Sequence, residues 1–401
     1  MRKLAFILSI FLIFTIPWED AVTFAGSASI TRYFGIITSI VWLVSVLFSG
    51  KLRRPHIFHL LAILFIVWNI ASIFWTLALD ETIQQIKTYL QLFVLIWIIW
   101  DLYNTLKALN NAMQAYILGA YVAIISTIHN YVIGREIKLY SGGRYAGTGN
   151  AVDLALILTL GIPIAWHLAT SIDNQHKNKI LRLINFAYLP AALVAILLTG
   201  TRMAIFAVIP AFVYVLGTSS RLKPTLRLPS LVALVGAMFW LEPLIPRSTF
   251  ERLGTAGASI IAGDLGGRVN IWLQSLTFFY DHPIFGIGSG ALSSNYGVGA
   301  LAHNTFLSVL TEVGLLGFIL FMCVLAVTIH QSIKQEKNYA FLWIAILTIW
   351  SIGVFTLTWE YRKATWLILT LIIVGANIKN KSLGNEDRPL ISSINEAVMY
   401  P

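Results

Sequence analysis

The chain is dominated by long apolar runs that alternate with short polar connections. A helix of about 20 apolar residues crosses the roughly 30 Å hydrocarbon core of a bilayer, and twelve runs approach or reach that length. They are residues 4–18, 31–49, 57–77, 83–103, 112–132, 151–170, 181–199, 203–218, 228–246, 304–331, 338–358 and 363–378. The pattern predicts an all-α polytopic membrane protein with about twelve transmembrane helices.

The composition excludes a soluble globular protein, because 57% of the 401 residues are hydrophobic and only 11% are charged. The first run follows Arg2 and Lys3 and could instead be a signal peptide, since residues 25–28 offer small side chains for cleavage. Its uninterrupted length and the polar residues 18–20 after it favour a retained helix. The single Cys323 lies inside an apolar run, so neither an intrachain disulfide nor a thiolate metal cluster is expected.

Lysine and arginine in the connections predict a cytoplasmic N-terminus, because cytoplasmic loops carry an excess of these residues. With that orientation, 17 of the 28 basic residues lie on the inner side and 11 lie on or near the outer face. The outer set is Arg32, Lys87, Arg135, Lys138, Arg144, Arg202, Arg247, Arg252, Arg268, Arg362 and Lys363. Eight of these 11 are arginine, whose planar fork suits phosphate. Because lysine and arginine are usually enriched on the cytoplasmic side, basic residues on the outer side indicate an anionic ligand there.

The chain is expected to divide into four parts. Residues 1–246 form helices one to nine with short loops, residues 247–303 form one long outer loop, residues 304–378 form helices ten to twelve, and residues 379–401 form a cytoplasmic tail. Within the long loop, positions 268–280 predict an amphipathic helix at the membrane interface. Its apolar face would hold Ile271, Trp272, Ser275, Leu276 and Phe279. Pro283 and several glycines then break regular structure, and we expect the loop to cover a cavity in the outer leaflet.

Two shorter outer elements carry arginine beside glycine. Residues 133–150 contain Arg144 and end at Asn150, which is suited to cap the next helix; a plain polar turn is the alternative. The turn at 199–202 places Arg202 close to hydrocarbon. An arginine in that position needs a partner, which is either a ligand or another side chain.

His303 is the candidate for acid–base chemistry. An imidazole accepts a proton near neutral pH, and Asn304 beside it, with arginines nearby in sequence, favours a general base over a satisfied interfacial histidine. Gly314 and Gly317 are expected to let a neighbouring helix approach closely. Glu312, nine residues after His303, is expected to face away from it, to lie deep in the membrane and to pair with another helix.

The motifs of several other chemistries are absent from the sequence. No D-x-D pair could hold a divalent metal, so metal dependence is not expected, and arginines could supply the counter-charge instead. Hydrolase, zinc-protease, Walker and dinucleotide signatures are also missing. The sequence therefore predicts no metal, no cofactor and no nucleic-acid partner.

His303-Asn304, followed by nine residues, Gly314, two residues and Gly317, resembles the H-N-x9-G-x-x-G signature of bacterial O-antigen ligases. The stretch GGRVNIW at 266–272 resembles the arginine-bearing periplasmic loop of that ligase and polymerase superfamily. Two further elements of the superfamily are matched by Thr201-Arg202 and by GGRYAGTGNAVDLA at 142–155. The resemblance spans about residues 140–320, and it is more specific for the superfamily than for ligase over polymerase.

The resemblance implies a membrane glycosyltransferase of the GT-C class in the bacterial inner membrane, with its active site facing the periplasm. Such an enzyme transfers O-antigen glycan from undecaprenyl diphosphate to the lipid A-core oligosaccharide, inverting the anomeric centre without metal or cofactor. By this resemblance His303 deprotonates the acceptor hydroxyl, while Arg202 and Arg268 bind the diphosphate. The remaining expected substrate-binding residues are Asn304, Arg144, Arg247 and Trp272.

Two other readings stay open. A polymerase of O-antigen or exopolysaccharide, or a ligase acting on a protein acceptor, would share the arginines and the histidine-bearing loop. A transporter of lipid-linked glycan would bind with the same arginines but without reaction. The 57-residue outer loop at 247–303 and the lack of charge through the inner half of the membrane disfavour the transporter.

Overall fold

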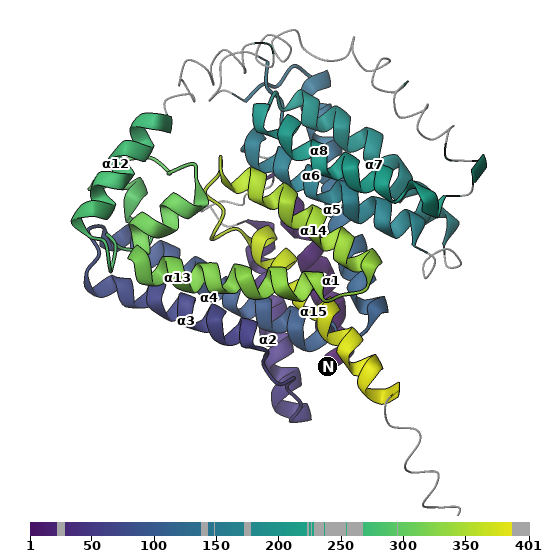
Figure 1. Ribbon diagram of the computed structural model, residues 1–401, viewed down its shortest axis with the longest axis horizontal. Helices are drawn as coiled ribbons and strands as arrows, with labels where there is room; N and C mark the ends of the chain where they lie inside the picture. Colours follow the sequence, from purple (N-terminus) through teal and green to yellow (C-terminus); the bar gives the residue numbers. More distant parts are fainter. Residues whose placement is uncertain are drawn as a thin grey trace, which may run out of the picture.

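In its computed structural model the protein is a bundle of helices joined mostly by short connections (Figure 1). The structure describes residues 1–21, 29–137, 143–147, 149–171, 178–222, 268–294 and 296–386, and the single residues 224, 225, 227, 236 and 254. The α-helices are α1 (Arg2–Thr15), α2 (Ile30–Ser49), α3 (Ile57–Ala71), α4 (Leu79–Leu102), α5 (Leu106–Val132), α6 (Ala151–Thr170), α7 (Lys179–Leu198), α8 (Arg202–Gly217), α12 (Arg268–Asp281), α13 (Thr305–Ile333), α14 (Lys337–Val354) and α15 (Lys363–Glu386). Short 3-10 helices are η1 (Ile16–Trp18), η2 (Ser72–Phe74), η4 (Ser219–Arg221) and η6 (Ala291–Ser293).

Eleven of the twelve predicted apolar runs coincide with helices, and the twelfth, residues 228–246, lies outside the described residues apart from the single residue 236. Nine of the described helices are long and apolar enough to cross a membrane. Helix α1 and the apolar part of α15, Lys363–Ile378, are shorter. The polytopic all-helical class is therefore confirmed, while the count of twelve spans and the single long periplasmic loop stay predictions.

Asparagine side chains fix where two helices of the candidate site begin. The Asn150 carboxamide oxygen accepts hydrogen bonds from the Val152 and Asp153 amides at 2.9 and 3.3 Å, which satisfies free N–H groups of the first turn of α6. The Asn304 oxygen accepts from the Leu307 amide at 3.1 Å in the same way. The cap predicted at Asn150 is confirmed, and His303 directly precedes a capped helix end.

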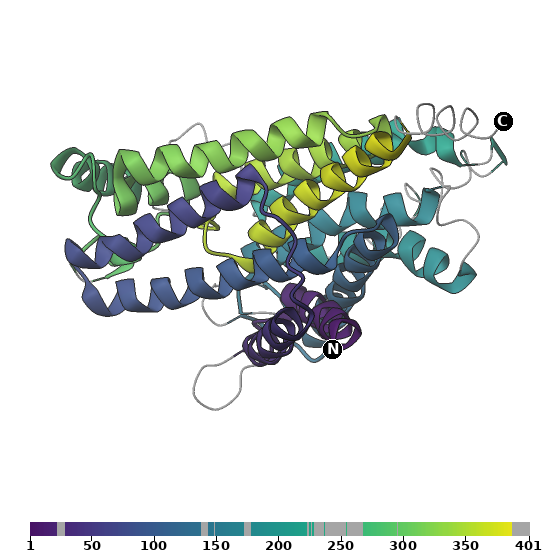
Figure 2. The same ribbon diagram turned by 90° about the horizontal axis from the view of Figure 1, so that it is seen from below.

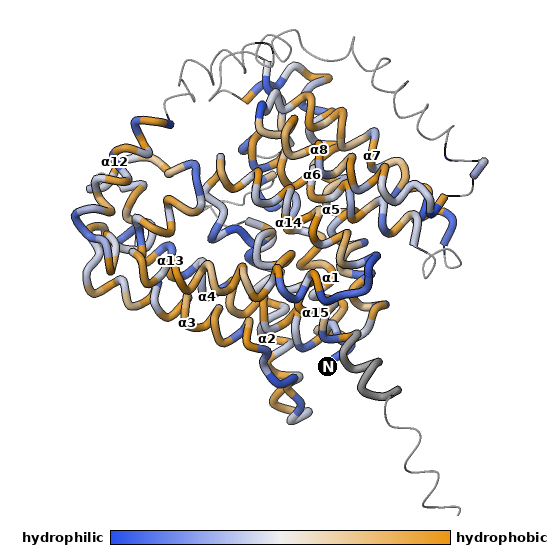
Figure 3. The backbone as a smooth tube through the Cα atoms, in the orientation of Figure 1, coloured by the Kyte–Doolittle hydropathy of each residue, from blue (hydrophilic) through white to orange (hydrophobic). Residues whose placement is uncertain are grey.

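The helices pack in two groups. Helix α6 is buried along nearly its whole length, with α5, α7, α8 and α14 around it. The second group packs α13 against α3, α12 and α15, and α15 against α4. Figure 3 shows hydrophobic residues along the helices and hydrophilic residues mainly in the connections. Large apolar side chains such as Phe48 and Phe74 remain exposed on the outside, as expected of helices that face lipid.

Helix α1 is an integral part of the bundle. It packs against α2 and α5, and its Leu12 and Ile13 side chains are buried. At its other end the buried Asp101 carboxylate of α4 accepts hydrogen bonds from the Arg2 guanidinium at 2.9 Å and from the Trp42 indole and the Arg53 amide at 3.0 Å. One carboxylate thus joins α1, α2, α4 and the connection before α3.

We expect Asp101→Ala to lower the free energy of unfolding by about 1–3 kcal/mol, because it leaves the Trp42 indole and the Arg53 amide without an acceptor. The measurement is the midpoint of thermal unfolding in detergent. Asp80→Ala on the same helix is the matched control. Because that carboxylate is exposed, its loss should change the free energy of unfolding by no more than about 0.5 kcal/mol. Equal midpoints for the two variants would contradict the role given to Asp101.

Candidate functional site

His303 adopts an unusual backbone conformation at the mouth of α13. Its φ of 49° is in the left-handed region, and it is the only described non-glycine residue there. Such a conformation is costly for a residue with a side chain and persists where surrounding contacts hold it. One of these contacts is the hydrogen bond from the His303 amide to the Thr358 hydroxyl, at 3.0 Å. This hydrogen bond therefore helps to hold the His303 backbone in the left-handed region.

Helix α12 lies across the end of α13 and brings Arg268 toward His303 (Figure 1). The Trp272 indole donates a hydrogen bond to the Ala302 carbonyl at 2.9 Å, next to His303 in the chain. Arg268 is one turn before Trp272 on the same helical face. Burial first, and then the positive charge of Arg268, lower the pKa of the His303 imidazole below its ordinary value. The ring is thus kept neutral, the form that can accept a proton.

This arrangement predicts the acid limb of the pH–rate profile. Because the pKa of His303 is lowered, the wild-type rate should fall only below the ordinary histidine pKa of about 6.5. Arg268→Gln should shift the limb of its remaining activity toward higher pH, because one of the two causes of the lowering is gone. The shift should be partial, since burial is the larger cause. A profile that does not move between the two proteins would contradict the pairing of Arg268 with His303.

The connection between α14 and α15, residues 355–362, closes over the first turn of α13. The Thr305 hydroxyl donates to the Leu357 carbonyl and accepts from the Trp359 amide, both at 2.8 Å. The Glu360 carboxylate is buried and accepts from the Ser308 hydroxyl at 2.8 Å, while its second oxygen has no hydrogen-bond partner among the described residues. Burial raises the pKa of Glu360 to about 7.

Glu360 was missed by the sequence reasoning. It contacts Ser308, one helical turn after the start of α13. Because its pKa is raised to about 7, Glu360 is a second group near His303 that titrates close to neutral pH. The available signal was an acidic residue two positions before Arg362, in a short connection expected on the outer side. Its contact with α13 depends on tertiary packing and has no sequence pattern.

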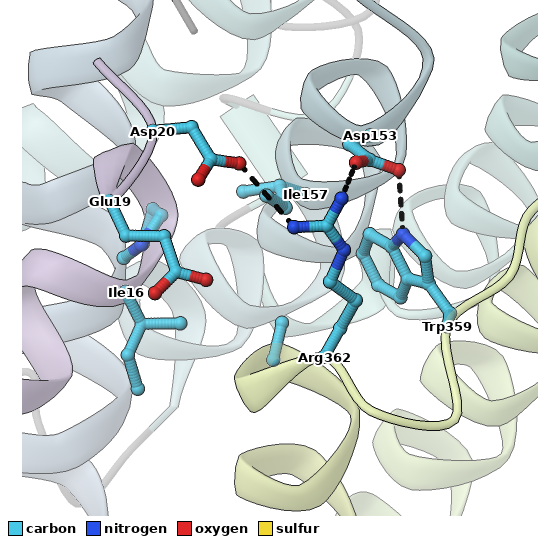
Figure 4. Close-up of a pocket in the computed structure, with 9 residues that line it drawn as sticks. Ile16, Glu19, Asp20, Asp153, Ile157, Trp359 and Arg362 are labelled. Carbon is cyan, nitrogen blue, oxygen red and sulfur yellow. Dashed lines mark hydrogen bonds and ion pairs between the residues drawn. The ribbon is translucent and has the colours of Figure 1, made fainter. Parts of the chain in front are cut away.

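Figure 4 shows Arg362 between the carboxylates of Asp20 and Asp153. Its guanidinium pairs with Asp153 at 2.5 Å and with Asp20 at 3.4 Å. The Trp359 indole also donates to Asp153, at 2.8 Å, and the adjacent Lys363 pairs with Glu19 at 2.5 Å. Arg362 and Lys363 belong to the outer basic set that was expected to indicate an anionic ligand. For these two residues that inference was wrong, because protein carboxylates are the partners.

Arg144 and Arg202 come together at the start of α8. The Arg144 guanidinium is buried and donates to the Thr199 carbonyl at 2.8 Å and to the Thr201 hydroxyl at 3.1 Å. Arg202 follows Thr201 directly and is half-buried. The geometry therefore makes Arg144 a support for the turn that presents Arg202. Sequence reasoning assigned both to the ligand and could not separate these roles.

Two groups of the expected site residues are linked through α6. His303, Asn304, Arg268 and Trp272 form one group at the junction of α12 and α13. The other is the Arg144–Arg202 pair, whose turn reaches α6 through the Thr201 hydroxyl and the Ala151 carbonyl at 3.3 Å. The same first turn of α6 binds the 355–362 connection through Asp153, as described above. Arg247 lies outside the described residues.

The close approach at Gly314 involves a loop rather than a helix. Helix α13 is interrupted there, with a φ of 66°, and a Cβ on Gly314 would lie 2.2 Å from the Ile284 carbonyl oxygen. The Leu315 amide donates to the Pro283 carbonyl at 2.9 Å across this break. The expectation of a neighbouring helix was wrong for Gly314, but Gly317 does adjoin α3, where a Cβ would lie 2.9 Å from Trp68.

Glu312 also differs from expectation. Its carboxylate accepts a hydrogen bond from the Gly290 amide at 2.7 Å, so it binds the backbone of the loop before η6 instead of a side chain on another helix. The loop 283–290 thus packs against the break in α13 and forms hydrogen bonds with residues before it, such as Glu312, and after it, such as Leu315. This arrangement fixes the short helical segment 305–313 on which Asn304 and His303 are mounted.

An open apolar groove begins beside Asn304. It has a volume of about 510 Å³ and runs between α12, α13 and the end of α14. The residues that line it include Trp272, Asn304, Phe306, Leu310, Phe318 and Phe355. Its apolar walls suit a hydrocarbon chain, and Asn304, which lines it, directly follows His303 in the chain. In the described part of the chain, no three His, Cys, Asp or Glu side chains come together as a candidate metal site.

The fold and this site define a multi-pass helical membrane protein with a histidine- and arginine-bearing polar site next to a lipid-facing groove. Residues 187–322 match the sequence profile of the family described as O-antigen ligase. The matched segment carries Arg202, Arg268 and His303, so this part of the chain is similar to the O-antigen ligase family that the motif resemblance predicted. No curated protein matches the chain.

Proposed function

We propose that the protein is an inverting, metal-independent ligase that transfers O-antigen glycan from undecaprenyl diphosphate to the lipid A-core oligosaccharide. The observation that carries the proposal is the placement of His303. Its backbone is held in the left-handed region beside Arg268, at the end of an apolar groove. A neutral base, a permanent positive charge and a lipid-sized groove are the three parts that this transfer needs.

The proposed reaction is a single displacement. A hydroxyl oxygen of the acceptor sugar attacks the anomeric carbon of the donor glycan from the face opposite the diphosphate. The bond between that carbon and the diphosphate oxygen breaks, and undecaprenyl diphosphate leaves with the electron pair. His303 takes the hydroxyl proton. Because diphosphate is a good leaving group, it needs charge neutralisation more than protonation, and the forked guanidinium groups of Arg202 and Arg268 supply it.

The donor chain is proposed to occupy the groove along α12 and α13. That position puts the diphosphate next to Asn304 and Trp272, both of which line the groove, and close to Arg268 one turn away on α12. Arg144 contributes by holding the turn of Arg202, at 2.8 and 3.1 Å from its acceptors. Arg247 is retained as a further diphosphate contact on the basis of its place in the loop sequence.

The proposed setting is the bacterial inner membrane, with the site on the periplasmic side. Residues 247–303 would be periplasmic and residues 379–401 cytoplasmic. The contacts support this orientation, because residues expected outside, such as Arg202 and Arg362, belong to the linked elements around His303. Residues expected inside, Arg2 and Arg53, meet instead around Asp101.

The test is deletion of the gene in its own bacterium, followed by gel analysis of lipopolysaccharide. Core that carries no polymer supports ligation to lipid A-core. Core that carries a single repeat unit identifies a polymerase of the same superfamily. Unchanged lipopolysaccharide together with lost glycosylation of a protein identifies a protein–glycan ligase. Loss of lipid-linked glycan from the periplasmic leaflet would point to a transporter.

We expect purified protein to transfer glycan at its full rate in excess EDTA. The motivation is the absence of a D-x-D pair and the presence of arginines where a metal would otherwise neutralise the diphosphate. Initial rates measured before and after chelation, with magnesium or manganese added back, decide the matter. A rate lost on chelation and restored by either ion is the contrary result.

A further inference from the structure

A second apolar groove lies on another face of the bundle, between α1, α2 and α4. Its volume is about 290 Å³. The lining residues include Leu12, Arg32, Gly35, Leu90, Ile98 and Lys363. Figure 2 shows the α1–α2 pair and α13 on opposite sides of the bundle, so this groove is separate from the one beside Asn304. The proposed transfer gives this second groove no role.

The shape of the groove suits a hydrocarbon chain that enters from the outer leaflet. Arg32 and Ile40 are eight residues apart on α2, which is about 12 Å along a helix. Ile36 and Ile40 of its wall are exposed by 51% and 58%, so the groove is open to lipid along its side. The floor is left open at Gly35, where an added Cβ would be in ordinary contact with Leu12 at 3.8 Å.

The outer end of the groove carries positive charge. Lys363 is already paired with Glu19 at 2.5 Å. The half-buried Arg32 side chain has no hydrogen bond or ion pair to any other side chain of the described residues. A guanidinium above an apolar groove complements a phosphate above a hydrocarbon chain. The chemistry that fits this groove is therefore that of a phosphate-bearing lipid.

The two grooves are joined by one segment of chain. Phe355, at the start of the 355–362 connection, lines the groove beside Asn304, and Lys363, just after it, lines the second groove. Between them Thr358 accepts the hydrogen bond from the His303 amide at 3.0 Å. The candidate base is thus anchored to a segment whose two ends border the two grooves.

We infer that the groove between α1, α2 and α4 binds the hydrocarbon anchor of the acceptor, a phosphorylated glycolipid, with one of its phosphates on Arg32. This rests on the proposed function, because a transfer between two lipid-anchored substrates needs a second lipid site when the donor occupies the first. Arg32 then acts in binding and takes no part in the chemical step.

The test uses the full chain in phosphatidylcholine nanodiscs and a photoactivatable, acylated diglucosamine bisphosphate as the probe. Cross-links mapped by mass spectrometry should fall on α2 and α4. Arg32→Gln should reduce them about 10-fold, the effect of one charge-assisted hydrogen bond. Gly35→Leu, which fills the floor, should do the same. Arg54→Gln is the matched control, because that arginine is exposed on the expected inner side and should leave the labelling unchanged.

Several results would overturn the inference. Labelling confined to α12 and α13 would mean that the acceptor shares the donor groove. Competition by phosphatidylglycerol at equal concentration would make the groove a general phospholipid site. Labelling that is unchanged in Arg32→Gln would show that Arg32 does not bind the phosphate of the acceptor. In transfer assays Arg32→Gln should raise the acceptor KM about 10-fold and leave the donor KM unchanged. A protein that labels as expected but transfers no glycan would support the groove and refute the proposed ligase.

Discussion

His303→Ala should reduce the rate of glycan transfer by about 10²–10⁴, the usual contribution of a positioned general base. The substitution removes the only described imidazole placed beside Arg268 at the mouth of α13. His303→Asn is the stronger version of the test. Asparagine tolerates the left-handed region better than other residues with side chains, so it should keep the backbone at a φ near 49° while removing the base. Both variants should show the same loss in a reconstituted assay with purified donor and acceptor.

The control is His282→Ala, in the same loop. His282 is exposed, and its backbone donates to the Phe278 carbonyl and accepts from the Gly286 amide, both at 3.0 Å, so alanine would keep both hydrogen bonds. Its side chain should be dispensable, with an unchanged rate and unfolding midpoint. A His303→Asn protein that turns over like the wild type would refute the general-base assignment. The raised pKa of Glu360, about 7, would then make that carboxylate the next candidate.

Much of the fold could be predicted because membrane helices are encoded locally. Each apolar run is long enough to span and must satisfy its own backbone hydrogen bonds, so run length alone locates α2 or α13. The cap at Asn150 is also local, because its side chain bonds the amide of a residue only three positions further along the chain. The break in α13 was not predictable in that way. A glycine inside an apolar run also fits close helix packing, and only the contact of Gly314 with residue Ile284 shows which reading applies.

The candidate site was predicted in part for the same reason. His303 and Asn304 belong to a local motif, and Arg268 and Trp272 lie on one predicted helical face. The roles of other charged residues depend on partners far away in sequence. Arg362 and Asp153 are separated by 209 residues, so nothing local distinguishes this structural ion pair from an arginine that awaits a ligand. Arg144 is a similar case, since its acceptors lie more than 50 residues further along.

Arg268→Lys and Arg202→Lys should each slow transfer by about 10- to 100-fold, with normal expression. A lysine keeps the positive charge but loses the planar fork, so it cannot make the bidentate hydrogen bonds proposed for the diphosphate. The loss of one charge-assisted hydrogen bond, about 1.5–3 kcal/mol, gives that range. Because the diphosphate belongs to the donor, the effect should appear in kcat/KM for the donor and leave the acceptor KM unchanged.

Two further lysine variants separate the proposed contact from other uses of arginine. Arg54→Lys, at an exposed position on the expected inner side, should change neither rate nor stability. Arg362→Lys should instead lower the unfolding midpoint, because its guanidinium bridges Asp153 and Asp20 at 2.5 and 3.4 Å. Arg268→Lys should resemble neither of them, with a slow rate and a wild-type midpoint. If Arg268→Lys and Arg202→Lys transfer glycan at the wild-type rate across donor concentrations, these arginines do not bind the diphosphate.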